Sequence, residues 1–347
     1  MNAMTTCEHG IERWSSAAWL AEAQAWLDER LAAAGRARTG ELRQPHLRPW
    51  ATALTAPTSG GAVWLKAAGP GTAFEAGLYE LLHSVAPEQV LEPIAVDVAR
   101  GWMLLPDGGT PLGERLQGDE LVDALTTILP SYAELQRAIA PHADRLLALG
   151  VRDMRPAVME QRFGEAVAAV GAYVDAHGSA RDRHDLERAA AMGDQVAAWA
   201  RQLGEAPGGA SLDHNDLHPW NMLVGDGPDA SGSAVFYDWV DSVVAHPFAS
   251  MLAALTFVRD NVPGCGADDP RLVRLRDAYL GPFADLAPHP ELVATLELAC
   301  RVGKVARALT WDRILRALDP RDVDDAWRRA PLACLASLPE DSHLGGA

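Results

Sequence analysis

The chain has 347 residues, with 30 Lys and Arg against 47 Asp and Glu, which gives a formal net charge of -17 at neutral pH. This length exceeds the roughly 250 to 300 residues at which one hydrophobic core stops growing, so we expect two lobes. No apolar run reaches the roughly 18 to 20 residues that cross a bilayer, and the acidic balance argues against nucleic acid and anionic lipid as partners. A cationic small molecule suits this charge better, although acidity also serves solubility alone.

The first residues, MNAMTTCEHG, lack the basic start and the unbroken apolar stretch of a secretory signal. The cysteines lie far apart and form no CxxC pair, so we interpret them as reduced thiols. These are Cys7, Cys265, Cys300 and Cys334. Together the two features predict a cytoplasmic protein. No heptad run or long apolar segment indicates a protein partner.

Residues 16–34 carry apolar side chains at helical spacing, with Ser16 suited to cap the first turn and Gly35 to end the last. The pattern predicts an amphipathic helix. Its buried stripe would consist of Trp19, Ala23, Trp26, Leu27 and Leu31.

Two strand-like runs, RPWATALTA and AVWLKA, flank the turn-prone PTSGG between residues 49 and 67 and predict a hairpin. A helix follows in TAFEAGLYELLHS, where Phe74, Leu78, Leu81 and Leu82 recur at helical spacing. IAVDV and WMLL then return to strand-like patterns. These elements predict a small mixed lobe with an antiparallel sheet.

From about residue 119 the pattern becomes mainly helical, first over DELVDALTTILPSYAELQRAI and PAVMEQRFGEAVAAVGAYVDA, then over RHDLERAAAMGDQVAAWARQL and again after residue 247. Pro and Gly concentrate in LLPDGGTPLG, between the two regimes. We therefore expect an α+β fold with an N-terminal lobe over residues 1–106, leading helix included, and a larger helical lobe over 107–347.

The most informative segment is HNDLHPWN, in which Asp216 and Asn221 lie five residues apart. Asp238 follows in YDWVD, after a second apolar run. Phosphoryl transfer needs a carboxylate to position an attacking hydroxyl and hard oxygen ligands for Mg2+. Asp216 suits the first task, and Asn221 and Asp238 suit the second.

HNDLHPWN resembles the HxDxxxxN catalytic loop of the aminoglycoside phosphotransferase family, which is related to protein kinases, and YDWVD resembles the metal-binding strand of the same family. Two such motifs in the right order are more specific than either alone. The resemblance implies a two-lobed protein-kinase-like fold and transfer of the terminal phosphoryl of Mg2+-bound ATP or GTP to a hydroxyl of a small molecule. It also implies that His214 is a scaffold residue of the loop.

The resemblance assigns roles in the N-terminal lobe as well. Lys66, on the second strand of the hairpin, would hold the nucleotide phosphates and Glu75 would orient it. Glu75 shares a helical face with Leu78 and Leu82, whereas Glu80 falls well around the helix, so Glu75 is the better partner. The purine would lie against the hinge, at residues Leu104, Leu105 and Asp107.

The C-terminal helices would form the acceptor site by the same analogy. Glu297 and Asp312, with Arg301 and Lys304, are its candidate polar contacts. Asp241, three residues beyond Asp238, would either face the acceptor or bind a second metal. An amino sugar, an aminoglycoside or an amino alcohol would suit the acidic charge of the chain. Trp220 and Trp239 flank the motifs, and we expect both to pack in the core.

Two alternatives remain at this stage. The family pattern usually has an acid where this chain has Ser250, a side chain too short and uncharged to replace a charge-assisted contact. The loop is then either braced differently or belongs to a nucleotide-binding pseudokinase with a regulatory role. His214, Asp216 and His218 could instead ligate a hydrolytic metal, but this leaves Asn221, Asp238 and Lys66 unexplained.

Overall fold

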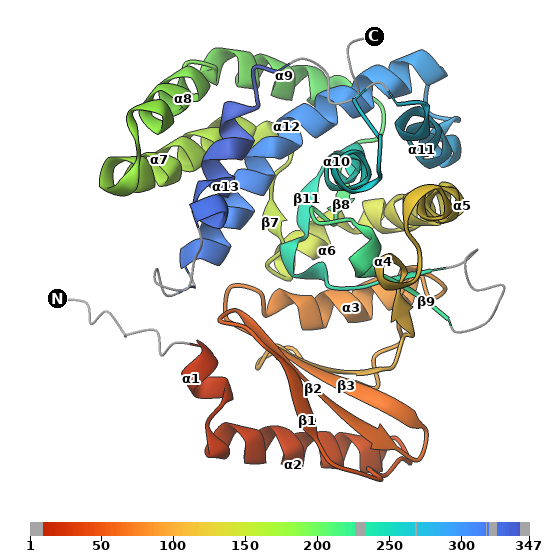
Figure 1. The fold of residues 1–347 in the computed structure, drawn as a ribbon. Coiled ribbons are helices and arrows are strands. Elements are labelled where there is room, and N and C mark those ends of the chain that lie inside the picture. The colour runs from red at the N-terminus through yellow and green to blue at the C-terminus, as the bar shows by residue number, and fades with distance from the viewer. Residues whose placement is uncertain (1–9, 226–233, 268, 317, 319–324, 341–347) are drawn as a thin grey trace. The chain divides into compact units, whose positions relative to one another are not determined.

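The computed structural model describes residues 10–225, 234–267, 269–316, 318 and 325–340 (Figure 1). Cys7 lies outside these residues, and the three described cysteines are free thiols. The chain divides into two compact units, unit 1 with residues 1–108 and 313–324 and unit 2 with residues 109–312 and 325–347. None of the helices within the described ranges is both long and apolar enough to span a membrane.

Within residues 10–108, unit 1 combines three helices with one antiparallel sheet, whose strand order is β1-β2-β3-β5-β4. Figure 1 shows α2 along one face of the sheet and α3 on the other side. The helices are α1 (Gly10–Trp14), α2 (Ala17–Ala33) and α3 (Phe74–Val85). The strands are β1 (Arg43–Leu47), β2 (Ala51–Thr58), β3 (Gly61–Ala68), β4 (Ala95–Asp97) and β5 (Trp102–Pro106).

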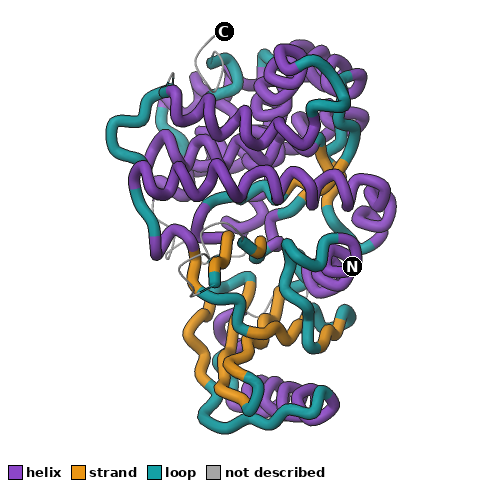
Figure 2. The backbone as a smooth tube through the Cα atoms, turned by 90° about the vertical axis from the view of Figure 1, so that its right-hand side faces the viewer, coloured by secondary structure: helices purple, strands orange, loops and turns teal. Residues whose placement is uncertain are grey.

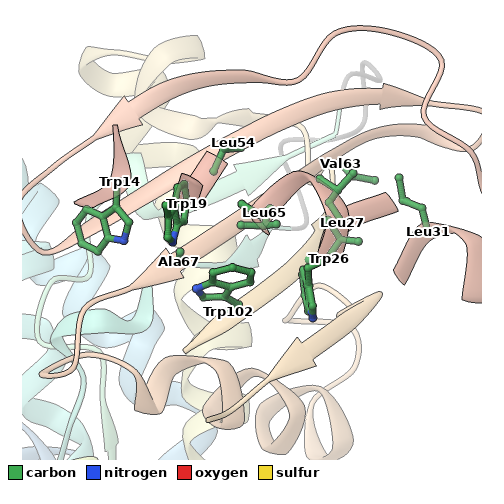
Figure 3. Close-up of a cluster of buried hydrophobic side chains, with 12 residues drawn as sticks. Trp14, Trp19, Trp26, Leu27, Leu31, Leu54, Val63, Leu65, Ala67 and Trp102 are labelled. Atoms are coloured by element: carbon green, nitrogen blue, oxygen red, sulfur yellow. The ribbon is translucent and has the colours of Figure 1, made fainter. Parts of the chain in front are cut away.

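The core of unit 1 is a tryptophan-rich cluster between α2 and the sheet (Figure 3). Trp102 of β5 receives the edges of Trp19 and Trp26 from α2, each with ring centroids 5.7 Å apart. Ser16 caps α2, since its side chain accepts a hydrogen bond from the Trp19 amide. All five residues of the expected apolar stripe are buried, so the sequence prediction of this helix is confirmed.

The β2–β3 hairpin pairs from Ala51 with Ala68 to Thr58 with Gly61, which confirms the predicted turn at its tip. Gly61 has a φ of 99°, a region that favours glycine. The Thr58 hydroxyl closes the turn by accepting from the Gly60 amide and donating to the Gly61 carbonyl. The sheet thus holds β3, and with it Lys66, in a fixed register.

Unit 2 is mainly helical, as the predominance of purple tube in its part of Figure 2 illustrates. Its helices are α4 (Leu112–Arg115), α5 (Gly118–Ile139), α6 (Ala143–Ala148), α7 (Met159–His177), α8 (Ala180–Ala190), α9 (Gly193–Glu205), α10 (Met251–Asn261), α11 (Pro270–Leu280), α12 (His289–Arg316) and α13 (Asp325–Ala336). Its strands are β6 (Thr110–Pro111), β7 (Arg152–Asp153), β8 (Ser211–Asp213), β9 (Met222–Val224), β10 (Val235–Phe236) and β11 (Val243–Ala245).

The short strands of unit 2 form two small sheets, β10-β9-β6 and β7-β11-β8. They carry the segment that contains both motifs, because β8 precedes HNDLHPWN and the antiparallel β9–β10 pair separates it from YDWVD. These sheets place the motif residues on short, rigid supports.

The structure differs from two local sequence predictions. The segment 183–203, which has one continuous helical pattern, contains most of α8 and most of α9, with a break at residues 191–192. Trp239 is fully buried as expected, but Trp220 is 46% exposed, so its assignment to the core was wrong.

Candidate active site

The segment HNDLHPWN of unit 2 begins where β8 ends. Asn215 and Asp238 are the two described non-glycine residues with positive φ, at 59° and 62°. The left-handed region is sparsely populated by side-chain-bearing residues, and Asn and Asp tolerate it best. Each of the two motifs therefore contains one left-handed residue shortly after a strand.

Asp216 is held from three sides. One carboxylate oxygen, Oδ2, lies 3.2 Å from His218 Nε2, and Oδ1 lies 3.2 Å from Arg307 Nη1. The side-chain amide of Asn221 donates to the Asp216 carbonyl at 2.9 Å and to Oδ2 at 3.3 Å. Burial opposes ionisation of this carboxyl, but the His218 hydrogen bond and the Arg307 charge outweigh it and lower the pKa of Asp216.

Arg307 links the loop to α12. Besides Asp216, its guanidinium donates to the Asn215 carbonyl and lies 4.0 Å from the Asp241 carboxylate. It also stacks 5.8 Å from the ring centroid of Trp311. Burial lowers the pKa of Arg307, yet the two carboxylates more than compensate and raise it. Sequence reasoning missed this residue, because nothing in the local pattern of α12 distinguishes it.

Asn221 and Asp238 come together at one end of the β9–β10 pair. Met222 pairs with Phe236, and the Tyr237 amide donates to the Asn221 carbonyl at 3.2 Å. Because the side-chain nitrogen of Asn221 faces Asp216, its side-chain oxygen points elsewhere. One amide oxygen and one carboxylate fit Mg2+, which takes few protein ligands and fills its shell with phosphate oxygens and water.

His214 is fully buried and contacts the second motif. Its Nε2 donates to the Tyr237 carbonyl at 3.0 Å, and its ring packs 4.7 Å from Trp239. Burial lowers the pKa of His214 and so favours the neutral imidazole. A hydrolytic metal at His214, Asp216 and His218 finds no support here, since the described residues contain no group of three or more such side chains placed to hold a metal.

In unit 1, Lys66 and Glu75 form the ion pair that the helical pattern predicts. The Nζ–Oε1 distance is 2.8 Å, and the Glu75 side chain is fully buried. Strand alternation explains the geometry, because Val63, Leu65 and Ala67 turn toward the tryptophan cluster and leave Lys66 on the opposite face, with α3. Glu80 is exposed, in agreement with its expected position on the outer side of α3.

The expected purine contacts lie in and just after β5. Leu104 is buried in the tryptophan cluster, and its carbonyl accepts from the Ile94 amide at 2.8 Å. The Asp107 amide donates to the Ala62 carbonyl at 3.1 Å. Leu105 pairs with Trp64 and so lies on the same face of the sheet as Lys66. Among the three, Leu105 is thus the one whose side chain shares a face with the Lys66–Glu75 pair.

The expected acceptor residues do not all meet. Asp241 is buried beside Arg307, and its backbone carbonyl accepts from the side-chain amide of Asn215. Glu297 lies ten residues before Arg307 on α12, which at about 1.5 Å per residue is about 15 Å along the helix. Asp312 is one to two turns beyond Arg307. Of the neighbouring cations, Lys304 donates to the Ser337 carbonyl instead and Arg301 stacks on Trp199.

A buried hydrogen-bond network supports the start of the HNDLHPWN segment. Gln136 of α5 donates to the carbonyls of Leu212 and Pro247 at 2.8 and 2.9 Å and accepts from Tyr279 at 2.6 Å. Tyr132, one turn earlier on α5, accepts from the His214 amide at 3.1 Å. Both side chains also contact the Ser250 hydroxyl, at 3.2 Å from Gln136 and 2.8 Å from Tyr132. Ser250 is therefore a hub of the network.

Several solved structures of small-molecule phosphotransferases are similar to this chain. The macrolide 2'-phosphotransferase MphH from Brachybacterium faecium is 20% identical, over 89% of this chain and 97% of that one, with a TM-score of 0.54. An ethanolamine kinase from Plasmodium vivax is 11% identical, over 85% of this chain and 82% of that one, with a TM-score of 0.59. APH(2")-IIia, in its GDP and kanamycin complex, is 14% identical, over 86% of this chain and 92% of that one, with a TM-score of 0.54.

No protein-family model matches the sequence, and no curated protein matches it. The structural matches nevertheless cover most of both chains, and they show that this protein has the two-lobed, kinase-like α+β fold of the aminoglycoside phosphotransferases and the choline and ethanolamine kinases. The fold that the two motifs predicted is thereby confirmed.

Proposed function

We propose that this protein transfers the terminal phosphoryl group of a Mg2+-bound nucleotide, ATP or GTP, to a hydroxyl of a small molecule. The observation that carries the proposal is the Asp216–Asn221 pair of unit 2. A carboxylate kept ionised by His218 and Arg307 is bound to an amide whose oxygen remains directed away from it. The same arrangement serves both halves of the reaction, one atom for the hydroxyl and one for the metal.

Asp216 would align the acceptor hydroxyl. Because the pKa of this carboxyl lies below its ordinary value, the group is ionised at neutral pH and is a weak base. It therefore accepts a hydrogen bond from the hydroxyl at the outset and takes the proton only as the new oxygen–phosphorus bond forms. Phosphoryl transfer depends mainly on such positioning and on charge stabilisation.

Asn221 and Asp238 are the residues that would hold Mg2+, and Lys66 is the one that would contact the phosphates. When bound, Mg2+ neutralises charge on the phosphate oxygens. Lys66 adds a fixed positive charge that Glu75 keeps oriented through their 2.8 Å ion pair. The GDP complex of a phosphotransferase with this fold supports a nucleotide as co-substrate.

The acceptor we propose is a polyhydroxylated or amino-bearing small molecule. The net charge of -17 favours an amine. Arg307, however, supplies a partly buried positive charge between Asp216 and Asp241, so the surroundings of the reacting hydroxyl are less acidic than the chain as a whole. Neutral sugars and macrolides therefore belong in the same test as aminoglycosides, amino sugars and choline.

The test is nucleotide turnover by the purified chain with MgATP or MgGTP against that panel of acceptors. Acceptor-dependent turnover should fall by at least about a hundredfold in Asp216→Asn, while nucleotide affinity stays within about twofold, because the residue meets the acceptor and not the nucleotide. Turnover that is equal in the variant would refute the role of Asp216. A chain that binds no nucleotide in the presence of Mg2+ would refute the proposal as a whole.

A further inference from the structure

The acid that the family pattern places at position 250 is absent from this chain, yet a carboxylate occupies the same network. Asp213, the residue before His214, is 1% exposed. The Ser250 hydroxyl donates to Asp213 Oδ1 at 2.7 Å. The two residues are distant in sequence, and the pairing of β8 with β11 brings their segments together. The network therefore contains a carboxylate, but Asp213 supplies it and the residue at position 250 does not.

Asp213 acts on the backbone of the loop directly. The same Oδ1 accepts from the Asn215 amide at 2.7 Å, a turn closed by the side chain two residues earlier. Asn215 is the left-handed residue of the loop, and this contact holds its amide in place. A hydrogen bond to a carboxylate is roughly twice as strong as one between neutral groups.

The position of Asn215 decides where Asp216 lies. Asn215 precedes Asp216 in the chain, and its side chain donates to Thr310 at 2.8 Å and to the Asp241 carbonyl at 3.2 Å. Its own carbonyl accepts from Arg307, which also contacts Asp216. A shift of the Asn215 amide would thus disturb the hydrogen bonds that aim the Asp216 carboxylate.

We propose that Asp213, paired with Ser250, is the positioning residue that holds the catalytic loop in this chain, in place of an acid at position 250. This proposal rests on the proposed function, since the loop is catalytic only if Asp216 serves phosphoryl transfer. Asp213 itself touches neither substrate nor metal, because it is buried and its contacts are internal. The absence of an acid at position 250 therefore gives no reason to regard the chain as a pseudokinase.

The first variant is Asp213→Asn, which keeps the shape of the side chain and removes its charge. We expect kcat to fall by about tenfold, the loss of roughly one charge-assisted hydrogen bond in the transition state. Nucleotide affinity should stay within about twofold, because the variant leaves the Lys66–Glu75 pair unchanged. An unaltered kcat would overturn the proposal. Asp182→Asn is the matched control, since Asp182 is a buried carboxylate that caps α8 and serves no site.

The second test exchanges the two side chains. Asp213→Ser removes the carboxylate, and Ser250→Asp places a second one against the first, so each single variant should lose at least about tenfold in kcat. The double variant, with serine at 213 and aspartate at 250, restores one carboxylate and one hydroxyl and should exceed both single variants. If the fold-loss in kcat of the double variant equals or exceeds the product of the fold-losses of the two single variants, the pairing is contradicted.

Unfolding of the wild type, Asp213→Ser, Ser250→Asp and the double variant separates failure of this proposal from failure of the proposed function. The effects of Asp213→Ser and Ser250→Asp on the free energy of unfolding should be non-additive in the double variant, because the two side chains are in contact. If the wild-type chain phosphorylates no acceptor while this coupling is present, the proposed function fails and the Asp213–Ser250 pairing stands. Additive free energies would overturn the pairing whatever the activity.

Discussion

Asp213→Asn should make the protein more stable at neutral pH, although the same change slows the proposed reaction. Burial raises the pKa of the Asp213 carboxyl to about 6 from an ordinary value of 3.8, against the opposing hydrogen bonds from Ser250 and the Asn215 amide. A carboxyl with a raised pKa binds its proton more tightly in the folded chain. The stability that this contributes is complete in acid and is lost as the pH rises through about 6.

The magnitude follows from the two pKa values. Their separation of about two units corresponds to about 3 kcal/mol of unfolding free energy, fully lost at about pH 8. Asparagine does not ionise, so Asp213→Asn escapes this loss and gives up only about 1 kcal/mol of hydrogen bonding. The variant should therefore be more stable than the wild type by about 2 kcal/mol at about pH 8. By about pH 5 this advantage should shrink by about 1.4 kcal/mol.

The neighbouring groups do not obscure this comparison. Tyr132, Tyr279, Cys300 and Arg307 surround the carboxyl, and each has a pKa raised above an ordinary value that already exceeds 8. None of the four changes its charge between about pH 5 and 8.

The assay is urea unfolding of both proteins, followed by tryptophan fluorescence at about pH 5, 6, 7 and 8. His214 follows Asp213 in the chain, and burial lowers its pKa, which favours the neutral imidazole. A stability difference that is the same at every pH, or that favours the wild type more as the pH rises, would refute the reasoning. Greater stability together with slower turnover is not what a residue of purely structural importance would give.

Three further outcomes follow from the contacts. Arg307→Met removes a positive charge 3.2 Å from Asp216, so the pKa of Asp216 should rise and the acid limb of the kcat/KM profile should move up by about one to three pH units. Glu75→Gln weakens the buried pair with Lys66 and should lower kcat/KM for the nucleotide by about tenfold, measured at saturating acceptor. Trp102→Ala should cost about 3 to 5 kcal/mol of unfolding free energy in urea, because it empties the centre of the tryptophan cluster.

Each of these changes has a matched control within the chain. Arg301→Met alters another arginine of α12, one that stacks on Trp199 and should leave the acid limb in place. Glu80→Gln alters the exposed glutamate of α3 and should leave nucleotide kinetics unchanged. Trp220→Ala, at a half-exposed tryptophan, should cost less than about 1 kcal/mol. If a control substitution has the same measured effect as the variant that it accompanies, the corresponding prediction is contradicted.

The sequence predicted features whose signal is local. The stripe of α2 follows from spacing along one helix, and the Lys66–Glu75 contact follows from the face of α3 on which Glu75 lies. Both depend on few residues and on regular geometry. The β2–β3 hairpin was equally accessible, since its turn residues stand between two strand patterns.

The sequence did not predict contacts that tertiary packing alone creates. Arg307 joins the loop from a helix some 90 residues later, and no periodicity or motif marks it among the other charges of α12. Asp213 directly precedes the motif in the sequence, but its role depends on Ser250, whose hydroxyl the fold brings within 2.7 Å of the Asp213 carboxylate. Strands of two or three residues, such as β6 and β7, are too short for any alternation to be detected.

The tryptophan cluster has a consequence for synthesis of the chain. Its 12 members, shown as sticks in Figure 3, all lie between Trp14 and Leu104, within one continuous stretch. Chains emerge from the ribosome at about 5 to 20 residues per second, and an N-terminal region folds first when its contacts are complete. This core can therefore close while most of unit 2 is still untranslated, which shields four large indole rings early from neighbouring nascent chains.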